Sequence, residues 1–309
     1  MPKLWLAPLH GITVFHFRNC IYRHNSGLDA AVTPFVPVQP TEKLNVKKWV
    51  DLAPDHNADK ETIPQLMGIE PSYFQDTMTA IHQEFGIEHF NWNLGCPMGP
   101  IVRKRRGCGL MPFPDDVERV VDAACRLPFR FSVKMRLGMH SVNEGLEIIR
   151  RLNDYPLEFV VVHPRLGDQQ YQGKTDLNAL REILSITRHR LVYSGDINTD
   201  EDFQMLQQRF PQINDWMLGR GQLRNPFLAE QIKGLSSSSD LMTRFNEFYE
   251  DLSQTTLHYR SKPRSLSVMK ELWHYFASFF HLTDEELHSL LVIQDWDEFQ
   301  QKVPLSKCR

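Results

Sequence analysis

A cysteine lies in a conformationally restricted turn of the chain, in the stretch "NWNLGCPMGP". Cys96 lies between Gly95 and Pro97, directly after a run that reads as a strand. An ordinary thiol, with a pKa of about 8.5, is mostly protonated at neutral pH and donates a proton without special tuning. Gly95 permits close approach of the backbone, and Pro97 stiffens the loop. The position between two turn-forming residues favours a functional cysteine over a buried structural one, while a nucleophilic thiolate would need a partner that the sequence does not assign.

Other residues that can do chemistry recur at the ends of the expected strands. In a barrel of parallel strands, this end forms the rim that carries the active site. The residues are Pro8, Leu9 and His10, then Gln65, Asn93, Lys134, Arg136, His163, Arg165, Ser194, Gly195, Asp196, Gly219, Arg220 and Gly221. We therefore expect one active site that is shared by most of the strands.

The last two strand ends predict a phosphate site. The glycines of Gly219-Arg220-Gly221 let backbone N–H groups approach an anion, and the arginine adds a charge-assisted bond. The matching turn is "SGD", Ser194 to Asp196. In barrels of this kind, phosphate pockets lie after the seventh and eighth strands.

The elements that must position these residues alternate between strands and helices. Such alternation predicts βαβ units and a parallel sheet, and the number of strands favours a (β/α)8 barrel, a TIM barrel, over a doubly wound sheet. The expected strands are residues 4–9, 28–35, 63–68, 88–94, 129–135, 158–163, 190–195 and 213–219, and clear helical patterns cover 71–85, 114–127, 142–155 and 176–187. Residues 36–62 have only weak helical character and read as a functional loop.

The spacing of apolar residues changes after a polar break, Ser236 to Asp240. Apolar residues recur at helical spacing beyond it, and no stretch resembles a strand. We therefore expect a catalytic barrel over residues 1–236 and a small all-helical domain over residues 237–309.

Composition narrows the class of protein. The chain has 309 residues, of which 41% are hydrophobic and 24% charged, as in an ordinary soluble protein. We expect neither a membrane span nor a signal peptide, and hence a cytoplasmic location. The five cysteines (Cys20, Cys96, Cys108, Cys125 and Cys308) form no C-x-x-C pair, and the 13 histidines show no ligand spacing, so we expect no disulfide and no metal.

The net charge of −3 does not indicate nucleic-acid binding, so such a role must rest on local patches. One patch, "RKRR", follows the cysteine loop and comprises Arg103, Lys104, Arg105 and Arg106. The other lies between residues 253 and 270, which include no acidic residue, and comprises Arg260, Lys262, Arg264 and Lys270. Both could track phosphates while a base enters the active site.

Together these stretches resemble the FMN-dependent dihydrouridine synthases. The order of "NLGCP", "KMRLG" and "HPR" is the most specific part, and "LAPLHGIT", "QLMG", "RGCGL", "YSGDI" and "LGRGQLRNP" also match. The resemblance runs from about Leu6 to Phe227 and continues into a helical tail like the family's RNA-binding domain. Family members reduce the C5–C6 double bond of uridine in folded RNA, usually transfer RNA, and NADPH recharges the flavin.

The resemblance implies how FMN would be held. Pro8 and Leu9 would pack their backbone against the flavin, and Gln65 would bond its pyrimidine edge. Lys134 would lie near the ring side that becomes negative on reduction, where a cation is physically sensible. The remaining cofactor residues would be His163 along the ring and Ser194, Gly195, Asp196, Gly219 and Arg220 at the ribityl phosphate.

The resemblance also implies the chemistry. Hydride from FMN would go to C6 of uracil, and C5 would gain a proton from Cys96 on the opposite face. Asn93 would orient the uracil, and Arg136, Arg165 and Gln170 would face the substrate. The partner would be RNA, most often tRNA, and we expect the protein to act as a monomer.

The sequence departs from the family pattern in two places. Ser194 stands where many members have Asn, and "RKRRGCGLMPF" replaces a stretch richer in Gly and Ala. FMN binding should survive the serine, but target choice need not be inherited. Two alternatives stay open: an FMN barrel that reduces a free pyrimidine or another small ene substrate, and an inactive RNA-binding relative. The helical tail and basic patches favour RNA, and the presence of Cys96, Lys134 and His163 argues against lost activity.

Overall fold

The computed structural model describes residues 1–57, 60–235 and 240–307. Most of the predicted polar break, Ser236 to Ser239, lies outside the described residues, and so does Cys308. Within the described ranges, strands and helices alternate from Lys3 to Lys233, and only helices follow from Leu241 onward.

Parallel strands close into a barrel. Ten strand segments make eight positions, because two positions are broken. One consists of β2 (Ala30–Val32) and β3 (Val36–Pro37), the next of β4 (Glu61–Ile63) and β5 (Gln65–Met67). The other strands are β1 (Lys3–Leu6), β6 (His89–Leu94), β7 (Arg130–Gly138), β8 (Val160–Leu166), β9 (Leu191–Ser194) and β10 (Asp215–Leu218).

The pairing runs round the barrel without a free edge. β10 pairs with β1 and β1 with β2, while β2 pairs with β4, β3 with β5 and β5 with β6. Pro34 and Pro64 stand at the two breaks, where a residue that cannot donate to the ladder is tolerated. The predicted (β/α)8 barrel followed by helices is confirmed.

Alternation along the strands divides the core into two parts. Successive side chains of a strand point to opposite faces. Side chains on one face fill the inside of the barrel: Trp5, Ala7, Ala30, Val32, Ile63, Phe159, Val161, Val192 and Met217. Residues between them, such as Leu4 and Leu6, pack against the surrounding helices.

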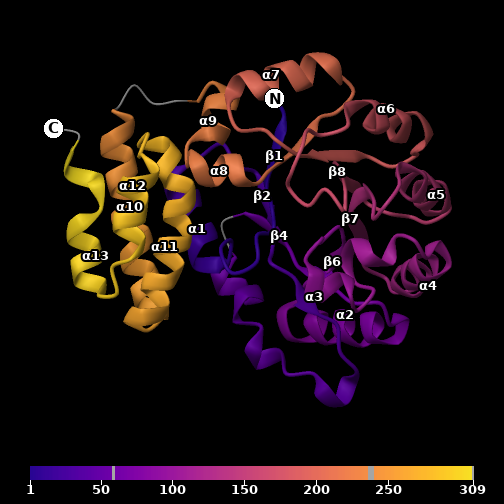
Figure 1. Ribbon diagram of the computed structural model, residues 1–309. Helices are drawn as coiled ribbons and strands as arrows, with labels where there is room; N and C mark the ends of the chain where they lie inside the picture. The colour runs from indigo at the N-terminus through magenta and orange to yellow at the C-terminus, as the bar shows by residue number, and fades with distance from the viewer. Residues whose placement is uncertain (58–59, 236–239, 308–309) are drawn as a thin grey trace.

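Helices surround the barrel, as Figure 1 shows. They are α1 (Phe15–His24), α2 (Pro71–Phe85), α3 (Gly99–Val102), α4 (Pro114–Cys125), α5 (Val142–Leu152), α6 (Leu177–Ile186), α7 (Asp200–Arg209), α8 (Arg220–Arg224) and α9 (Leu228–Lys233). Local signals explain where several begin. α4 opens with proline at its first position, Asp176 caps α6, and Thr199 and Asp202 form a capping box on α7.

The long stretch between β3 and β4 forms four short 3-10 helices: η1 (Thr41–Lys43), η2 (Val46–Lys48), η3 (Val50–Leu52) and η4 (Pro54–His56). A fully buried arginine of α1, Arg18, binds this stretch to the barrel. Its guanidinium donates to the Asp51 carboxylate at 3.0 Å and to the amide oxygen of Asn57 at 2.7 Å. The stretch is therefore held against α1, while its functional role stays a prediction.

The C-terminal helices are α10 (Leu241–Tyr259), α11 (Lys262–Phe279), α12 (Asp284–Leu291), α13 (Trp296–Lys302) and the 3-10 helix η6 (Pro304–Lys307). They share an aromatic core in which Phe245 and Phe248 of α10 meet Phe276 of α11 edge to face. α10 packs on α1 and α11 packs on α8, so these helices lie beside the barrel (Figure 1). That they form a separate domain from residue 237 stays a prediction.

Candidate active site

One cavity lies at the carboxyl ends of the barrel strands. Its lining includes all the predicted cofactor residues except Gln65: Pro8, Leu9, Lys134, His163, Ser194, Gly195, Asp196, Gly219 and Arg220. Gln65 is fully buried and bonds to its neighbours inside the barrel. The fold thus brings together side chains from β1, β7, β8, β9 and β10, although their roles remain predictions.

The predicted phosphate turn has a charge arrangement that the sequence does not reveal. The Asp196 carboxylate is paired with the Arg165 guanidinium through both oxygens, and Arg220 lies 3.4 Å from it. A carboxylate repels an anion, so Asp196 would act by holding Arg220 rather than by contacting a phosphate. Among the described residues, the backbone N–H groups of Arg220 and Gly221 have no partner. These groups and the Arg220 guanidinium are the donors that an anion would meet.

Two ionisable groups in the cavity are shifted by burial and by neighbouring cations. Burial, together with nearby Arg136, lowers the pKa of Lys134 to about 8. Burial and the charge of Lys134 hold the pKa of His163 well below its usual range, so its imidazole is neutral at pH 7. The Arg165 guanidinium lies 3.1 Å from Nε2 of His163, and because arginine only donates, Nε2 accepts. No ion pair or hydrogen bond involves the Lys134 amine among the described residues.

A chain of amides links the barrel interior to the cysteine loop. Asn91 donates to the Ser132 hydroxyl at 3.0 Å, and Gln65 donates to the Asn91 oxygen at 2.8 Å. Asn93 then donates to the Gln65 oxygen, also at 2.8 Å. The predictions from sequence omitted Asn91, although its place two residues before Asn93 in one strand puts both on the same face. Because each amide fixes the next, Gln65 has a defined orientation below the cavity.

The Cys96 loop is held from several sides. The Asn93 side-chain oxygen accepts the N–H groups of Gly95 and Cys96, and the Arg136 guanidinium donates to the Gly95 carbonyl at 3.1 Å. Gly107, at φ +55°, packs so closely that a Cβ there would lie 2.6 Å from the Cys96 carbonyl oxygen. Burial raises the pKa of the Cys96 thiol, so it stays protonated at neutral pH. A partly exposed, protonated thiol on a fixed loop can donate a proton.

The predicted substrate residues divide into bonded and exposed side chains. Arg136 and Arg165 are almost fully buried, and both bond to protein groups, Arg136 to the Leu166 carbonyl and Arg165 to the Gly173 carbonyl. Gln170 is exposed on the loop after β8 and has a φ of +50°. The structure therefore gives both arginines a structural role, and their contact with substrate stays a prediction.

Tyr171 lines the cavity but was not among the predicted site residues, although it stands in the stretch "HPRLGDQQYQG". Its ring lies under the guanidinium groups of Arg220 and Arg136, at 4.7 and 5.2 Å from the ring centroid. Half of its surface is exposed. The exposed part of this aromatic ring, which lies beside two cations in the cavity lining, is available to contact a flat ligand.

The basic residues predicted to contact RNA fall into two groups. Arg105 pairs with Asp116 at 2.6 Å, and Lys262 pairs with Asp297 at 2.7 Å. In contrast, no ion pair within the described ranges involves the others: Arg103, Lys104, Arg106, Arg260 and Arg264. Arg264 is exposed. Burial lowers the pKa of the Arg260 guanidinium, and the nearby charge of Arg264 lowers it further. The second group has charge available for phosphates.

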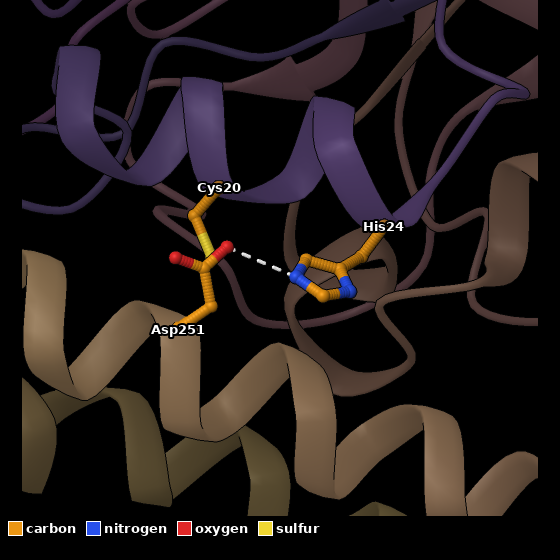
Figure 2. A group of neighbouring side chains, drawn as sticks. All are labelled: Cys20, His24 and Asp251. Atoms are coloured by element: carbon orange, nitrogen blue, oxygen red, sulfur yellow. Dashed lines mark hydrogen bonds and ion pairs between the residues drawn. The ribbon is translucent and has the colours of Figure 1, made fainter.

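One cluster of potential metal ligands occurs among the described residues: Cys20 and His24 of α1 and Asp251 of α10. Figure 2 shows the Asp251 carboxylate between the two α1 side chains, with His24 Nε2 at 2.9 Å from it. The exposed guanidinium of Arg23 also donates twice to this carboxylate, at 2.8 and 3.0 Å. Because a cation already neutralises Asp251, the cluster is best described as a clamp between α1 and α10.

Comparison with known proteins agrees with this geometry. The family model described as "Dihydrouridine synthase (Dus)" matches residues 5–292, which include the cavity, the Cys96 loop and most of the C-terminal helices. The chain belongs to the dihydrouridine synthase family. The resemblance predicted from sequence is therefore confirmed.

Curated Dus proteins are similar to this chain at about one identical residue in four. A probable tRNA-dihydrouridine synthase of Rhizobium leguminosarum bv. phaseoli is 28% identical over 75% of this chain and 72% of its own length. A probable tRNA-dihydrouridine synthase of Helicobacter pylori is 25% identical over 97% of both chains. A tRNA-dihydrouridine(16) synthase of Cupriavidus necator is 26% identical over 77% of this chain and 76% of its own length.

Solved structures support the barrel. A morphinone reductase in complex with tetrahydroNAD superposes on this Dus chain with a TM-score of 0.51 at 11% identity, and covers 77% of this chain and 88% of its own. At this identity the likeness concerns the fold alone. No helix within the described ranges is long and apolar enough to cross a membrane.

Proposed function

We propose that this protein reduces the C5–C6 double bond of specific uridines in folded RNA. The expected RNA is tRNA, FMN is the resident cofactor, and NADPH is the reductant. The observation that carries the proposal is the position of Cys96. It is a protonated thiol on a fixed loop, joined through Asn93 and Gln65 to the interior of the barrel below the cationic cavity. Membership of the Dus family supports the same reaction.

The residues of the cavity fit FMN. A phosphate monoester needs N–H donors and a cation, and the unpartnered N–H groups of Arg220 and Gly221 with the Arg220 side chain supply them. A flavin ring needs a cation where it becomes negative, and within the described ranges no ion pair or hydrogen bond engages the Lys134 amine. Bound FMN supplies the hydride that reduces C6 of uracil.

The chain's own residues complete the reduction. C5 must gain a proton, and the Cys96 S–H is the donor, because burial keeps the thiol protonated at neutral pH. Asn93 holds Cys96 through its N–H and so sets where the sulfur lies. His163 is neutral, and the negative charge of Asp196 is engaged in ion pairs. Lys134 and Arg220 therefore give the cavity a net positive charge, which suits anionic ligands.

The C-terminal helices and the unpaired cations are proposed to bind the RNA. Arg260 and Arg264 lie where α10 ends and α11 begins, and Arg103 and Lys104 lie on the loop that follows Cys96. Both groups would neutralise phosphates while one uridine is drawn from the RNA into the cavity. We expect the protein to act as a monomer.

Purified protein tests the proposal directly. It should be yellow, release FMN on denaturation, and form dihydrouridine in unmodified tRNA when NADPH is added. Cys96→Ala should keep the flavin and its reduction by NADPH but lose roughly 10²- to 10⁴-fold in uridine reduction, the usual contribution of a general acid.

Cys108→Ala is the matched control. Cys108 is buried beside Cys96, where its thiol lies 3.2 Å from the Cys96 carbonyl oxygen. Its loss should lower stability and leave uridine reduction within a few-fold. A colourless protein that cannot be reconstituted with FMN would reject the proposal, and efficient turnover of free uracil without RNA binding would assign a small-molecule reductase instead.

A further inference from the structure

Two rings lie face to face at the rim of the barrel. The imidazole of His10 and the phenyl ring of Phe35 have centroids 4.8 Å apart, and their planes are 13° from parallel. His10 directly follows Leu9, which lines the cavity, and Phe35 stands in the break between β2 and β3. His10 is exposed and Phe35 is half-buried. The pair is therefore a flat aromatic surface beside the candidate active site.

The backbone presents His10 at the tip of a tight turn. The Ile12 N–H donates to the Leu9 carbonyl at 3.1 Å, and Gly11 has a φ of +80°, as the third residue of a type II turn requires. The buried Thr13 hydroxyl accepts the Leu9 N–H at 2.8 Å and anchors the turn from below. Because the turn is held at both ends, His10 stays at the rim without a ligand to order it.

Phe35 is supported in the same way. Thr33, fully buried, donates from its hydroxyl to the Pro34 carbonyl and accepts the N–H of Gln65 at 3.2 Å. Val36 then pairs with Leu66 in the barrel sheet. The Phe35 ring thus rests on a segment that is tied into the barrel, and it covers one face of the imidazole.

No polar contact in the part of the chain that the structure describes accounts for the exposed imidazole of His10. Among the described residues, neither ring nitrogen of His10 takes part in a hydrogen bond or an ion pair. A stacked pair of rings that leaves its outer ring exposed is suited to a third flat ring, and a nucleobase is the flat ring that an RNA brings to this rim.

We propose that His10 and Phe35 form a stacking platform for the RNA base next to the uridine that is reduced. The inference rests on the proposed function. When a uridine leaves the stack and enters the cavity, the neighbouring base loses its own stacking partner. Stacking on the platform replaces that contact and tolerates any base, because every base has a π-face. The platform would therefore lower the free energy of the extruded state without reading sequence.

An affinity cycle tests the platform. The probe is an unmodified tRNA transcript, together with a set of transcripts that each carry one abasic nucleotide in a single-stranded segment. His10→Ala should raise the Kd for intact RNA roughly 5- to 100-fold, the usual effect of one base–aromatic stack. For wild-type protein, one abasic transcript should show the same increase in Kd relative to intact RNA. For His10→Ala, that abasic transcript and intact RNA should have equal Kd values. Mapping of dihydrouridine should place that nucleotide next to the reduced uridine.

Three further proteins separate stacking from other roles. His10→Phe should restore binding, whereas His10→Leu, which has bulk without an aromatic face, should not. His288→Ala removes an exposed histidine of α12 and should leave binding unchanged. Equal losses on every transcript, an abasic position far from the reduced uridine, or loss of flavin from His10→Ala would overturn the platform. If wild-type protein fails to reduce RNA, the proposed function fails on its own, a result distinct from the affinity cycle.

Discussion

The side-chain oxygen of Asn93 accepts the backbone N–H of Cys96 at 2.9 Å, while the amide nitrogen of the same residue donates to Gln65 at 2.8 Å. One side chain thus joins the loop of the proposed acid to Gln65, the residue expected to bond the pyrimidine edge of the flavin. The Asn93 amide therefore orients both the Cys96 backbone and the Gln65 side chain. A substitution of Asn93 therefore tests this link while Cys96 and Gln65 themselves stay unchanged.

Asn93→Ala removes the hydrogen bonds to Gly95, Cys96 and Gln65 and should slow uridine reduction by at least about 5- to 100-fold, because even one buried group left without its partner costs about 1 to 3 kcal/mol. Reduction of the flavin by NADPH should stay close to normal, since Lys134 and Arg220 are untouched. Rapid mixing with NADPH and then with RNA measures the two half-reactions separately. Asn153→Ala is the control, because Asn153 also makes hydrogen bonds through both its amide nitrogen and its amide oxygen, but outside the cavity. Equal slowing of both half-reactions would contradict the assignment.

Lys134 should give the flavin-free protein a stability that depends on pH. Its folded pKa of about 8 lies below the ordinary value of 10.5, so between these values the unfolded chain binds more protons than the folded protein. The free energy of unfolding then rises with pH across this window. Lys134→Met should stabilise the flavin-free protein at pH 7, and the gain should shrink as the pH approaches 10.

Urea denaturation at pH 7, 8, 9 and 10, followed by circular dichroism, measures this gain. Lys43→Met, which removes an exposed lysine from η1, controls for the general effect of pH on the chain. A gain for Lys134→Met that is the same at every pH would show that the amine is not desolvated in the folded protein.

The two classes of cation should differ in how RNA binding depends on salt. Arg264→Ala should lower the slope of log K against log salt by about one, because the side chain is exposed and has no ion-pair partner within the described ranges. Lys262→Ala should lower it less, since Asp297 already neutralises that ammonium group at 2.7 Å. Filter binding from low to moderate salt measures both slopes. Identical slopes for the two variants would show that the ion pair opens when RNA binds.

Asp251→Asn should loosen the contact between α1 and α10. The substitution removes the negative charge that pairs with His24 (Figure 2) and with Arg23, and we expect a loss of about 1 to 2 kcal/mol in the free energy of unfolding. Asp154→Asn is the matched control, because its pair with Arg188 is far more exposed and should contribute less than about 0.5 kcal/mol. Chemical denaturation gives both values, and an equal effect of the two substitutions would rule out a clamp.

The sequence by itself determined the features that depend on neighbours along the chain. Short β-rich strands, helices that open with Pro114 or Asp176, and the glycine turn at Gly219 are all local features, so their residue types predicted them. The barrel followed, because alternating strands and helices leave few other arrangements. The same local signals placed the predicted cofactor residues at strand ends, where the fold collects all of them except Gln65 into one cavity.

Only the tertiary structure decided which side chains meet. Asp196 pairs with Arg165, which is 31 residues away, and Arg220 lies 3.4 Å from the same carboxylate, whereas the place of Asp196 at the phosphate stays a prediction. Arg23 bonds to Asp251 across 228 residues. No local pattern encodes such pairs, because they depend on where the backbone carries distant segments. The sequence therefore determined which chemistry is available at the rim, and the path of the chain decided which charges remain free for a ligand.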